Sequence, residues 1–193
     1  LVALLAVSAL LASCSESELW QNPQTEARDG YIMLNFKTEI PAMQEVVTRA
    51  VDPDGGGVQD MTLFCFDSYG LFISTVKAGV TVQKPGPGEM EGTFKAEVPE
   101  NTRTIHFLAN QNMDEFKEDS FRNKSESEVM AVLEGSSGRM IYWGRFACDA
   151  GNDSNIAEQM ATSGNSVKLI RNHARISVDN PDNNGHIVIT GFA

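Results

Sequence analysis

Apolar and polar positions alternate along much of the chain, and this pattern predicts short β-strands. In residues 31–38 the side chains of Ile32, Leu34 and Phe36 fall on one face of an extended segment. Residues 93–98 alternate in the same way. Further strands are expected at 61–66, 71–76, 103–109, 140–147, 167–178 and 186–192, with turn residues between them.

One helix is expected over residues 125–134. Ser125 and Glu128 have the spacing of a capping box, and the apolar residues that follow lie on one helical face before Gly135. About eight short strands with one short helix favour an all-β fold, an antiparallel β-sandwich. Because the last predicted strand runs into Ala193, we expect the C-terminus of the protein to be missing from this sequence.

Residues 1–13 form an uncharged apolar run. The run is too short to cross a bilayer, which takes about 20 residues, and it has the length of an export signal. A buried N-terminal helix is the alternative. The run ends in Leu11-Ala12-Ser13-Cys14, which resembles the lipobox of bacterial lipoproteins. We therefore expect a signal peptide over 1–13, acylation of Cys14 and a polar tether over 14–30.

The acidic net charge of the chain disfavours anionic partners. The chain has 26 Asp and Glu against 15 Lys and Arg, a formal net charge of −11. A protein that binds the phosphate backbone needs a cationic surface, so nucleic acid is not an expected partner. Electrostatic docking to anionic lipid is disfavoured for the same reason.

Catalytic and metal-binding motifs are absent from the sequence. It has no nucleophile elbow, P-loop, zinc-protease helix or CxxC pair. We expect no enzyme activity, catalytic residue, metal site or cofactor. Cys65 and Cys148 could form a disulfide in an exported protein, but their apolar surroundings favour buried thiols. His106, His173 and His186 are interpreted as strand residues.

The order of the segments carries a resemblance. The lipobox is followed by Thr48-Arg49-Ala50, then Phe66-Asp67 with Gly70, then Phe107-Leu108-Ala109-Asn110, and then Leu169, Arg171, Ala174 and Val178. In this order the chain resembles the fimbrillin family, the major fimbrial subunit-like lipoproteins of Gram-negative anaerobes. The match implies that residues 31–193 are the N-terminal β-sandwich domain of a family member and that a C-terminal domain is missing. Residues 140–144 depart from it, since members often have a strand with Pro-Met there.

The resemblance implies a fold and a mechanism. It implies a transthyretin-like Greek-key β-sandwich, carried to the outer membrane and cell surface by its lipid and incorporated into a fimbrium that supports adhesion. An Arg-specific protease cuts beyond the first strand, that strand leaves, and a strand of another fimbrial subunit takes its place. The implied partners are thus other subunits, the protease and, through the lipid, the membrane.

The resemblance implies that residues 31–38 are the removable strand. The side chains of Ile32, Leu34 and Phe36 would fill the apolar groove that this strand leaves when it is removed. Arg49 is the expected processing site, with an ordinary solvated loop charge as the alternative. Arg28 precedes the strand, so a cut there would open nothing.

A second function remains open. The chain could be a monomeric glycan-binding outer-membrane lipoprotein that keeps its first strand. Tyr142 and Trp143 would then form an aromatic stacking platform for a sugar.

Overall fold

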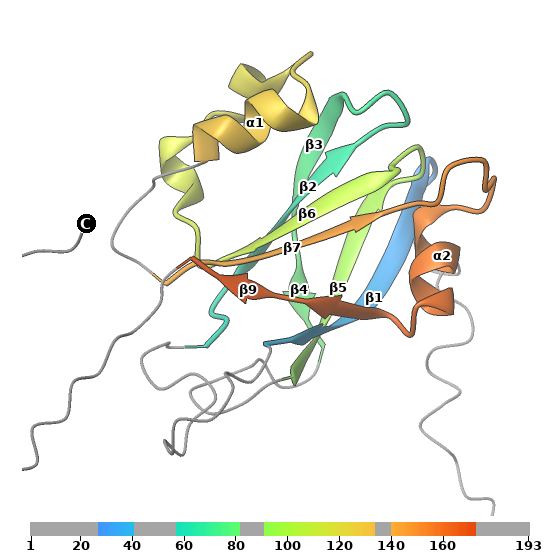
Figure 1. Ribbon diagram of the computed structural model, residues 1–193, viewed down its shortest axis with the longest axis horizontal. Helices are drawn as coiled ribbons and strands as arrows, with labels where there is room; N and C mark the ends of the chain where they lie inside the picture. Colours follow the sequence, from blue (N-terminus) through green and yellow to red (C-terminus); the bar gives the residue numbers. More distant parts are fainter. Residues whose placement is uncertain (1–26, 41–56, 82–90, 134–139, 173–193) are drawn as a thin grey trace, which may run out of the picture.

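Two β-sheets make up most of the molecule (Figure 1). The computed structural model describes residues 27–40, 57–81, 91–133 and 140–172. The strands are β1 (Tyr31–Glu39), β2 (Met61–Phe66), β3 (Phe72–Lys77), β4 (Gly79–Val80), β5 (Glu91–Pro99), β6 (Thr104–Ala109), β7 (Tyr142–Ala147), β8 (Ser166–Lys168) and β9 (Ile170–Arg171). The helices are α1 (Glu126–Leu133), α2 (Ile156–Thr162) and the 3-10 turns η2 (Met113–Glu115) and η3 (Glu118–Phe121).

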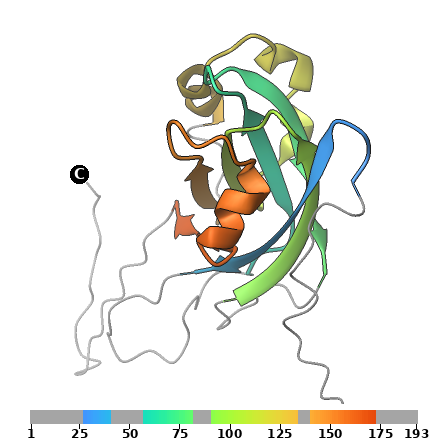
Figure 2. The same cartoon turned by 90° about the vertical axis from the view of Figure 1, so that its right-hand side faces the viewer.

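The strand order is β4-β5-β1-β8 in the first sheet, called sheet A, and β3-β2-β6-β7-β9 in the second, called sheet B. The sheets pack face to face (Figure 2). The predicted all-β sandwich is therefore confirmed. Each strand pair in the described residues is antiparallel except β1 and β8, which run parallel. The expectation of a wholly antiparallel fold is wrong at this pair, because the chain enters sheet A from α2 in the direction of β1.

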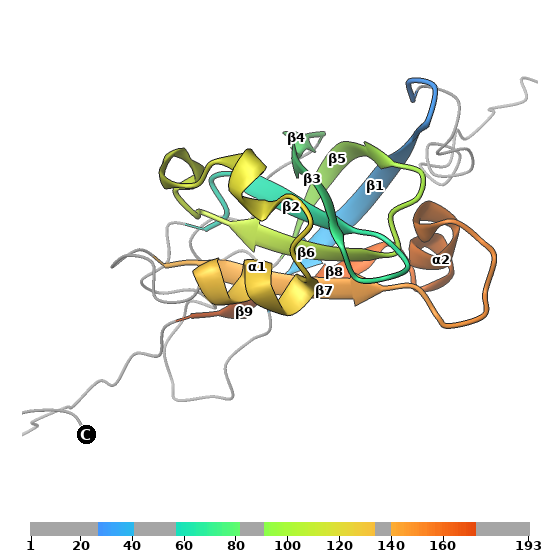
Figure 3. The ribbon, with the colours of Figure 1, turned by 90° about the horizontal axis from the view of Figure 1, so that it is seen from above.

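Sheet B is covered on both faces. The strands β2 and β6 are buried at every residue, which explains why the sequence of β2 is apolar on both sides. Their inner side chains join the core between the sheets. On the outer face, Phe64, Phe66 and Leu108 pack with Phe121 of η3 and Val129 of α1, and α1 lies across this face (Figure 3).

The predicted helix is confirmed as α1. The Glu128 carboxylate accepts hydrogen bonds from the Ser125 backbone N–H at 2.8 Å and the Ser125 hydroxyl at 2.6 Å. The Ser125 hydroxyl in turn accepts from the Glu128 backbone N–H at 3.4 Å. These reciprocal bonds are the capping box that the sequence spacing predicts.

A second helix, α2, was not predicted. It lies beside β1 at one side of the sandwich (Figure 1). Asn155 and Glu158 form its capping box, and Ile156, Ala157 and Met160 extend the core between the sheets.

No helix in the described part of the chain is long and apolar enough to cross a membrane.

The strand predicted over 167–178 is divided between the two sheets. β8 pairs with β1 in sheet A, and after Leu169 the chain pairs with β7 in sheet B as β9. The segment that crosses between the sheets packs directly against Gly144 of β7. A Cβ at Gly144 would lie 2.8 Å from Val167 Cγ1 and 3.0 Å from the Lys168 carbonyl oxygen, so a larger residue would push this segment away. The predicted residues 173–178 and the strand at 186–192 lie outside the described residues.

Candidate functional site

The first strand, β1, lies inside sheet A rather than at its edge. It pairs antiparallel with β5 from Tyr31 opposite Pro99 to Glu39 opposite Glu91. On its other side, Lys37 to Glu39 pair parallel with β8. We call the position between β5 and β8 the β1 slot. Because β1 has a partner strand on each side, its removal would expose backbone hydrogen-bonding groups of both neighbours.

The three predicted plug residues point into the core. Ile32, Leu34 and Phe36 are all buried, and all belong to the main apolar cluster between the sheets. The Phe36 ring stacks on Phe94 of β5 with ring centroids 5.8 Å apart, and it meets Phe107 of β6 edge-on at 5.0 Å. The structure therefore brings the predicted residues together as one inner face of β1.

A fourth inner residue of β1 was missed. Thr38 continues the two-residue period and is 0% exposed. Its hydroxyl oxygen has no hydrogen-bond partner within the described residues, although buried hydroxyl groups ordinarily find one. The alternation that identified the first three residues could have found Thr38, but threonine reads as polar in such a pattern.

The start of β1 is fixed by Arg28. The Arg28 backbone N–H and Nε donate to the two carboxylate oxygens of Glu97 in β5, at 2.6 and 2.7 Å. These hydrogen bonds hold the pKa of Glu97 below its ordinary value, and the bond from the Arg28 backbone contributes more than the bond from its side chain. The guanidinium carbon also lies 4.2 Å from the centre of the Tyr31 ring. Arg28 thus ties the entry of β1 to β5.

The end of β1 is fixed by β8. The Lys37 backbone N–H donates to the Asn165 carbonyl at 2.6 Å, and the Leu169 backbone N–H donates to the Glu39 carbonyl at 2.7 Å. The Ser166 hydroxyl donates to the Glu39 carboxylate. β1 is the only strand that pairs with β8 among the described residues, so β8 depends on β1 for its place in sheet A.

Two predicted site residues cannot be placed. The acylation residue Cys14 and the processing residue Arg49 both lie outside the described residues. Cys65 and Cys148 are free thiols. Burial raises the pKa of Cys65 to about 12 and raises that of the half-buried Cys148, so both thiols stay protonated at neutral pH.

The aromatic platform for a sugar is wrong. Tyr142 is 0% exposed and belongs to the core between the sheets. Trp143 faces the opposite side of β7, because successive side chains of a strand alternate, and it packs beside the outer cluster of sheet B. The two rings therefore do not share a surface.

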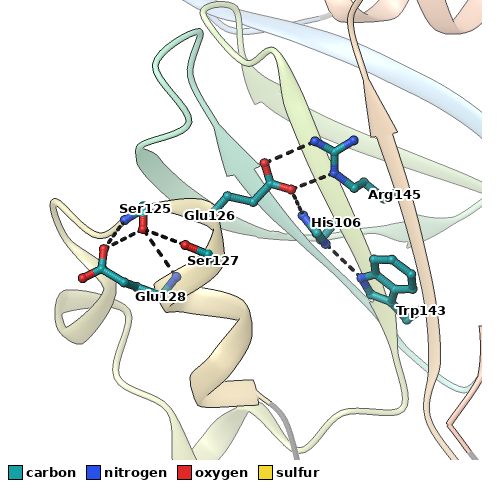
Figure 4. A network of polar contacts seen from close by, with 7 residues as sticks. All are labelled: His106, Ser125, Glu126, Ser127, Glu128, Trp143 and Arg145. Atoms are coloured by element: carbon teal, nitrogen blue, oxygen red, sulfur yellow. Dashed lines mark hydrogen bonds and ion pairs between the residues drawn. The ribbon is translucent and has the colours of Figure 1, made fainter.

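Trp143 instead belongs to a polar network that joins α1 to sheet B (Figure 4). Its indole N–H donates to His106 Nδ1 at 2.9 Å, and His106 Nε2 lies 2.8 Å from Glu126 of α1. Arg145 Nε donates to the same carboxylate at 2.7 Å. Since an indole nitrogen only donates, Nδ1 must accept, and the proton of the neutral imidazole lies on Nε2.

The electrostatics of this network keep His106 neutral. Burial lowers the pKa of His106 and outweighs the opposite pull of Glu126. Hydrogen bonds from Arg145 hold the pKa of Glu126 below its ordinary value, and the same pair raises the pKa of Arg145. His106 is thus a buried strand residue, as interpreted, and it fastens α1 to β6 and β7.

No cluster of three or more potential metal ligands occurs among the described residues.

The chain has a distant likeness to solved structures. No family model matches the sequence, and no curated protein matches it. The chain is similar to the crystal structure of a proposed cell adhesion protein from Bacteroides eggerthii DSM 20697, with 10% sequence identity and a TM-score of 0.36. The similarity covers 72% of this chain and 40% of that one. The chain therefore spans less than half the length of that protein, and its function has to be argued from its own geometry.

Proposed function

We propose that the chain is a structural or accessory subunit of a cell-surface fimbria that supports adhesion. It is exported as an outer-membrane lipoprotein through Cys14, and it assembles when β1 is exchanged for a strand of another subunit. Its role is structural rather than catalytic.

The position of β1 carries this proposal. β1 is the third of four strands in the order of sheet A, with β5 on one side and β8 on the other. Loss of an edge strand would only shorten a sheet, but loss of β1 leaves a slot bounded by two strands. Such a slot offers an incoming strand backbone partners along the whole of β5, a second partner in β8 at the positions of Lys37 to Glu39, and an apolar floor. These are the requirements of β-strand addition.

The order of elements supports the same mechanism. β1 precedes every other described element, and residues 41–56, which include Arg49, connect it to the rest of the chain. A single cut after Arg49 would separate β1 without breaking any other described element. The acylated Cys14 lies on the same side of that cut, so the cut would also release the subunit from its lipid.

A cut alone would not empty the slot. Burial of Ile32, Leu34 and Phe36 contributes roughly 1.5–3 kcal/mol for each side chain. The cleaved strand also keeps its hydrogen bonds to β5 and β8. We therefore expect β1 to stay bound after cleavage until a competing strand displaces it.

The test uses protein from the complete gene, treated with an Arg-specific protease. N-terminal sequencing should find a new end at Ala50, and size-exclusion chromatography should show oligomers. Arg49→Lys keeps the charge but removes the cleavage site, so it should block both changes. Arg122→Lys, at an exposed arginine that contacts no residue of β1 or β5, is the matched control and should leave both intact. Polymerisation of the Arg49→Lys protein at the parental rate would rule out strand exchange triggered at this residue.

A further inference from the structure

We infer that the strand which replaces β1 comes from another subunit and carries a defined pattern of inner side chains. This inference rests on the proposed strand exchange. The pattern is two aliphatic residues, then an aromatic residue, then Val at the position where β1 has Thr38, each separated by one outward residue.

The register between β1 and β5 gives the pattern residue by residue. On the inner face, each side chain of β1 lies opposite a β5 residue of a different size from the next one along the strand. The opposed residues are Ile32 and Val98, Leu34 and Ala96, Phe36 and Phe94, and Thr38 and Gly92. An incoming strand must match the sequence Val, Ala, Phe, Gly that β5 presents, so its register is set by side-chain size as well as by backbone bonds.

The third inner position requires an aromatic ring. Phe36 is fully buried between Phe94, on which it stacks, and Phe107, which it meets edge-on. An aliphatic residue would leave part of this space empty and lose both ring contacts, which are worth more than the area they bury. A shift of the incoming strand by two residues would place an aliphatic side chain between the two rings. This position therefore anchors the register.

The fourth inner position is where β1 fits its slot least well. The Thr38 hydroxyl is buried without a partner in the described residues, and such a group destabilises the folded state. Gly92, directly opposite, has no side chain, and Val167 on the other neighbour is apolar. Valine has the shape of threonine without the hydroxyl, so an incoming strand with Val there would bind more tightly than β1 itself.

This weak position explains how β1 can be both stable and replaceable. Before cleavage, β1 is part of the chain, and its high effective concentration keeps it in the slot. After cleavage that advantage is lost, and a strand of better fit can displace it. Thr38 is thus a specificity-determining residue of the exchange.

The test measures displacement by peptides. A recognition sequence for a highly specific protease is inserted between residues 41 and 56 of the full chain, which is then cut. The protein is loaded with a fluorescent copy of residues 28–40. Unlabelled peptides of the same residues compete for the slot: the parent, Thr38→Val, Phe36→Ala and, as matched control at an exposed outward position, Lys37→Ala.

We expect Lys37→Ala to compete within about twofold of the parent. Thr38→Val should bind about 3–10-fold more tightly, and Phe36→Ala at least about 100-fold more weakly. If the parent peptide binds but Thr38→Val is no tighter, or Phe36→Ala is no weaker, the inferred pattern is wrong while strand exchange stands. If even the parent peptide fails to enter the slot, strand exchange itself is wrong. The inserted cleavage site makes both results independent of Arg49.

Discussion

Among single residues, Gly144 determines how closely the two sheets can be joined. A Cβ at this position would lie within 3.0 Å of Val167, Leu169 and the Lys168 backbone. Gly144→Ala should therefore lower the free energy of unfolding by about 1–3 kcal/mol, because the segment that crosses from β8 to β9 has to move outward. Urea denaturation measures this effect. Gly79→Ala is the matched control in β4, where the nearest atom would be 3.8 Å away, and a comparable loss there would contradict the explanation.

His106 gives stability a dependence on pH. Its pKa in the folded protein lies below the ordinary 6.5, so the unfolded chain binds more protons once the pH falls to this range. The contribution of His106 to the free energy of unfolding should be constant above about pH 7 and should decrease as the pH drops below 6.5 towards the folded pKa. Glu126, whose pKa is also lowered, adds a separate decrease below about pH 4.5.

Denaturation curves between pH 4 and pH 8 test this dependence. His106→Gln removes the titrating group, so its stability, though lower overall, should stay level between pH 5.5 and pH 7. The decrease from Glu126 at lower pH should remain. A parental slope in the His106→Gln protein would assign the effect to another group.

At the scale of elements, α2 depends on its cap. The Glu158 backbone N–H donates to the Asn155 side chain at 3.0 Å, and the Asn155 backbone N–H donates to the Glu158 carboxylate at 3.1 Å. Asn155→Ala should lower the free energy of unfolding by about 1 kcal/mol, while Asn155→Asp, which keeps the acceptor, should change it by only a few tenths. Thermal denaturation followed by circular dichroism would show the difference. Equal losses in the two variants would mean that the cap contributes nothing.

The same helix shows what the sequence could and could not predict. Asn155 and Glu158 have the spacing that identified α1 at Ser125 and Glu128, so α2 had a signal of the same kind. Its seven residues form barely two turns, which makes the apolar period hard to recognise. The alternation of apolar and polar residues located strands because successive side chains of a strand face opposite sides, whichever strands it pairs with.

Pairing between distant strands was beyond such local signals. Alternation shows that Val167 faces a core, but it does not show that β8 joins β1 in parallel. Nor does it show that the chain changes sheet at Leu169. Tyr142 and Trp143 were misjudged for a different reason. Successive side chains of a strand face opposite sides, so these two neighbours in β7 could not form one platform, and Tyr142 lies in the core between the sheets.

At the scale of the whole molecule, sheet A cannot be complete without its first strand. β5 would keep only its short pairing with β4, over Gly79 and Val80, and β8 would keep no partner strand among the described residues. The inner face of β1 contributes several kcal/mol of burial, which is comparable with the total stability of an ordinary domain, about 5–15 kcal/mol.

A chain that begins at Ala50 should therefore melt at a much lower temperature than the whole chain, or without a cooperative transition. Addition of the peptide of residues 28–40 should restore the transition, and the melting temperature should rise with peptide concentration. Differential scanning calorimetry with a peptide of the same composition in scrambled order is the control. A cooperative melt without peptide at the parental temperature would show that sheet A persists without β1.

The pairings of β1 also set an order in time. A ribosome delivers Tyr31 to Glu39 before any segment with which they pair. The bonded residues Arg28 and Glu97 are 69 positions apart, and Glu39 and Ser166 are 127 apart. While the chain is being made, sheet B can assemble from segments that are closer in sequence. β1 can thus pair with β5 early, but it receives its second partner, β8, only after β2, β3, β6 and β7 of sheet B have been made. A newly made subunit therefore passes through a stage in which one side of the slot is still open.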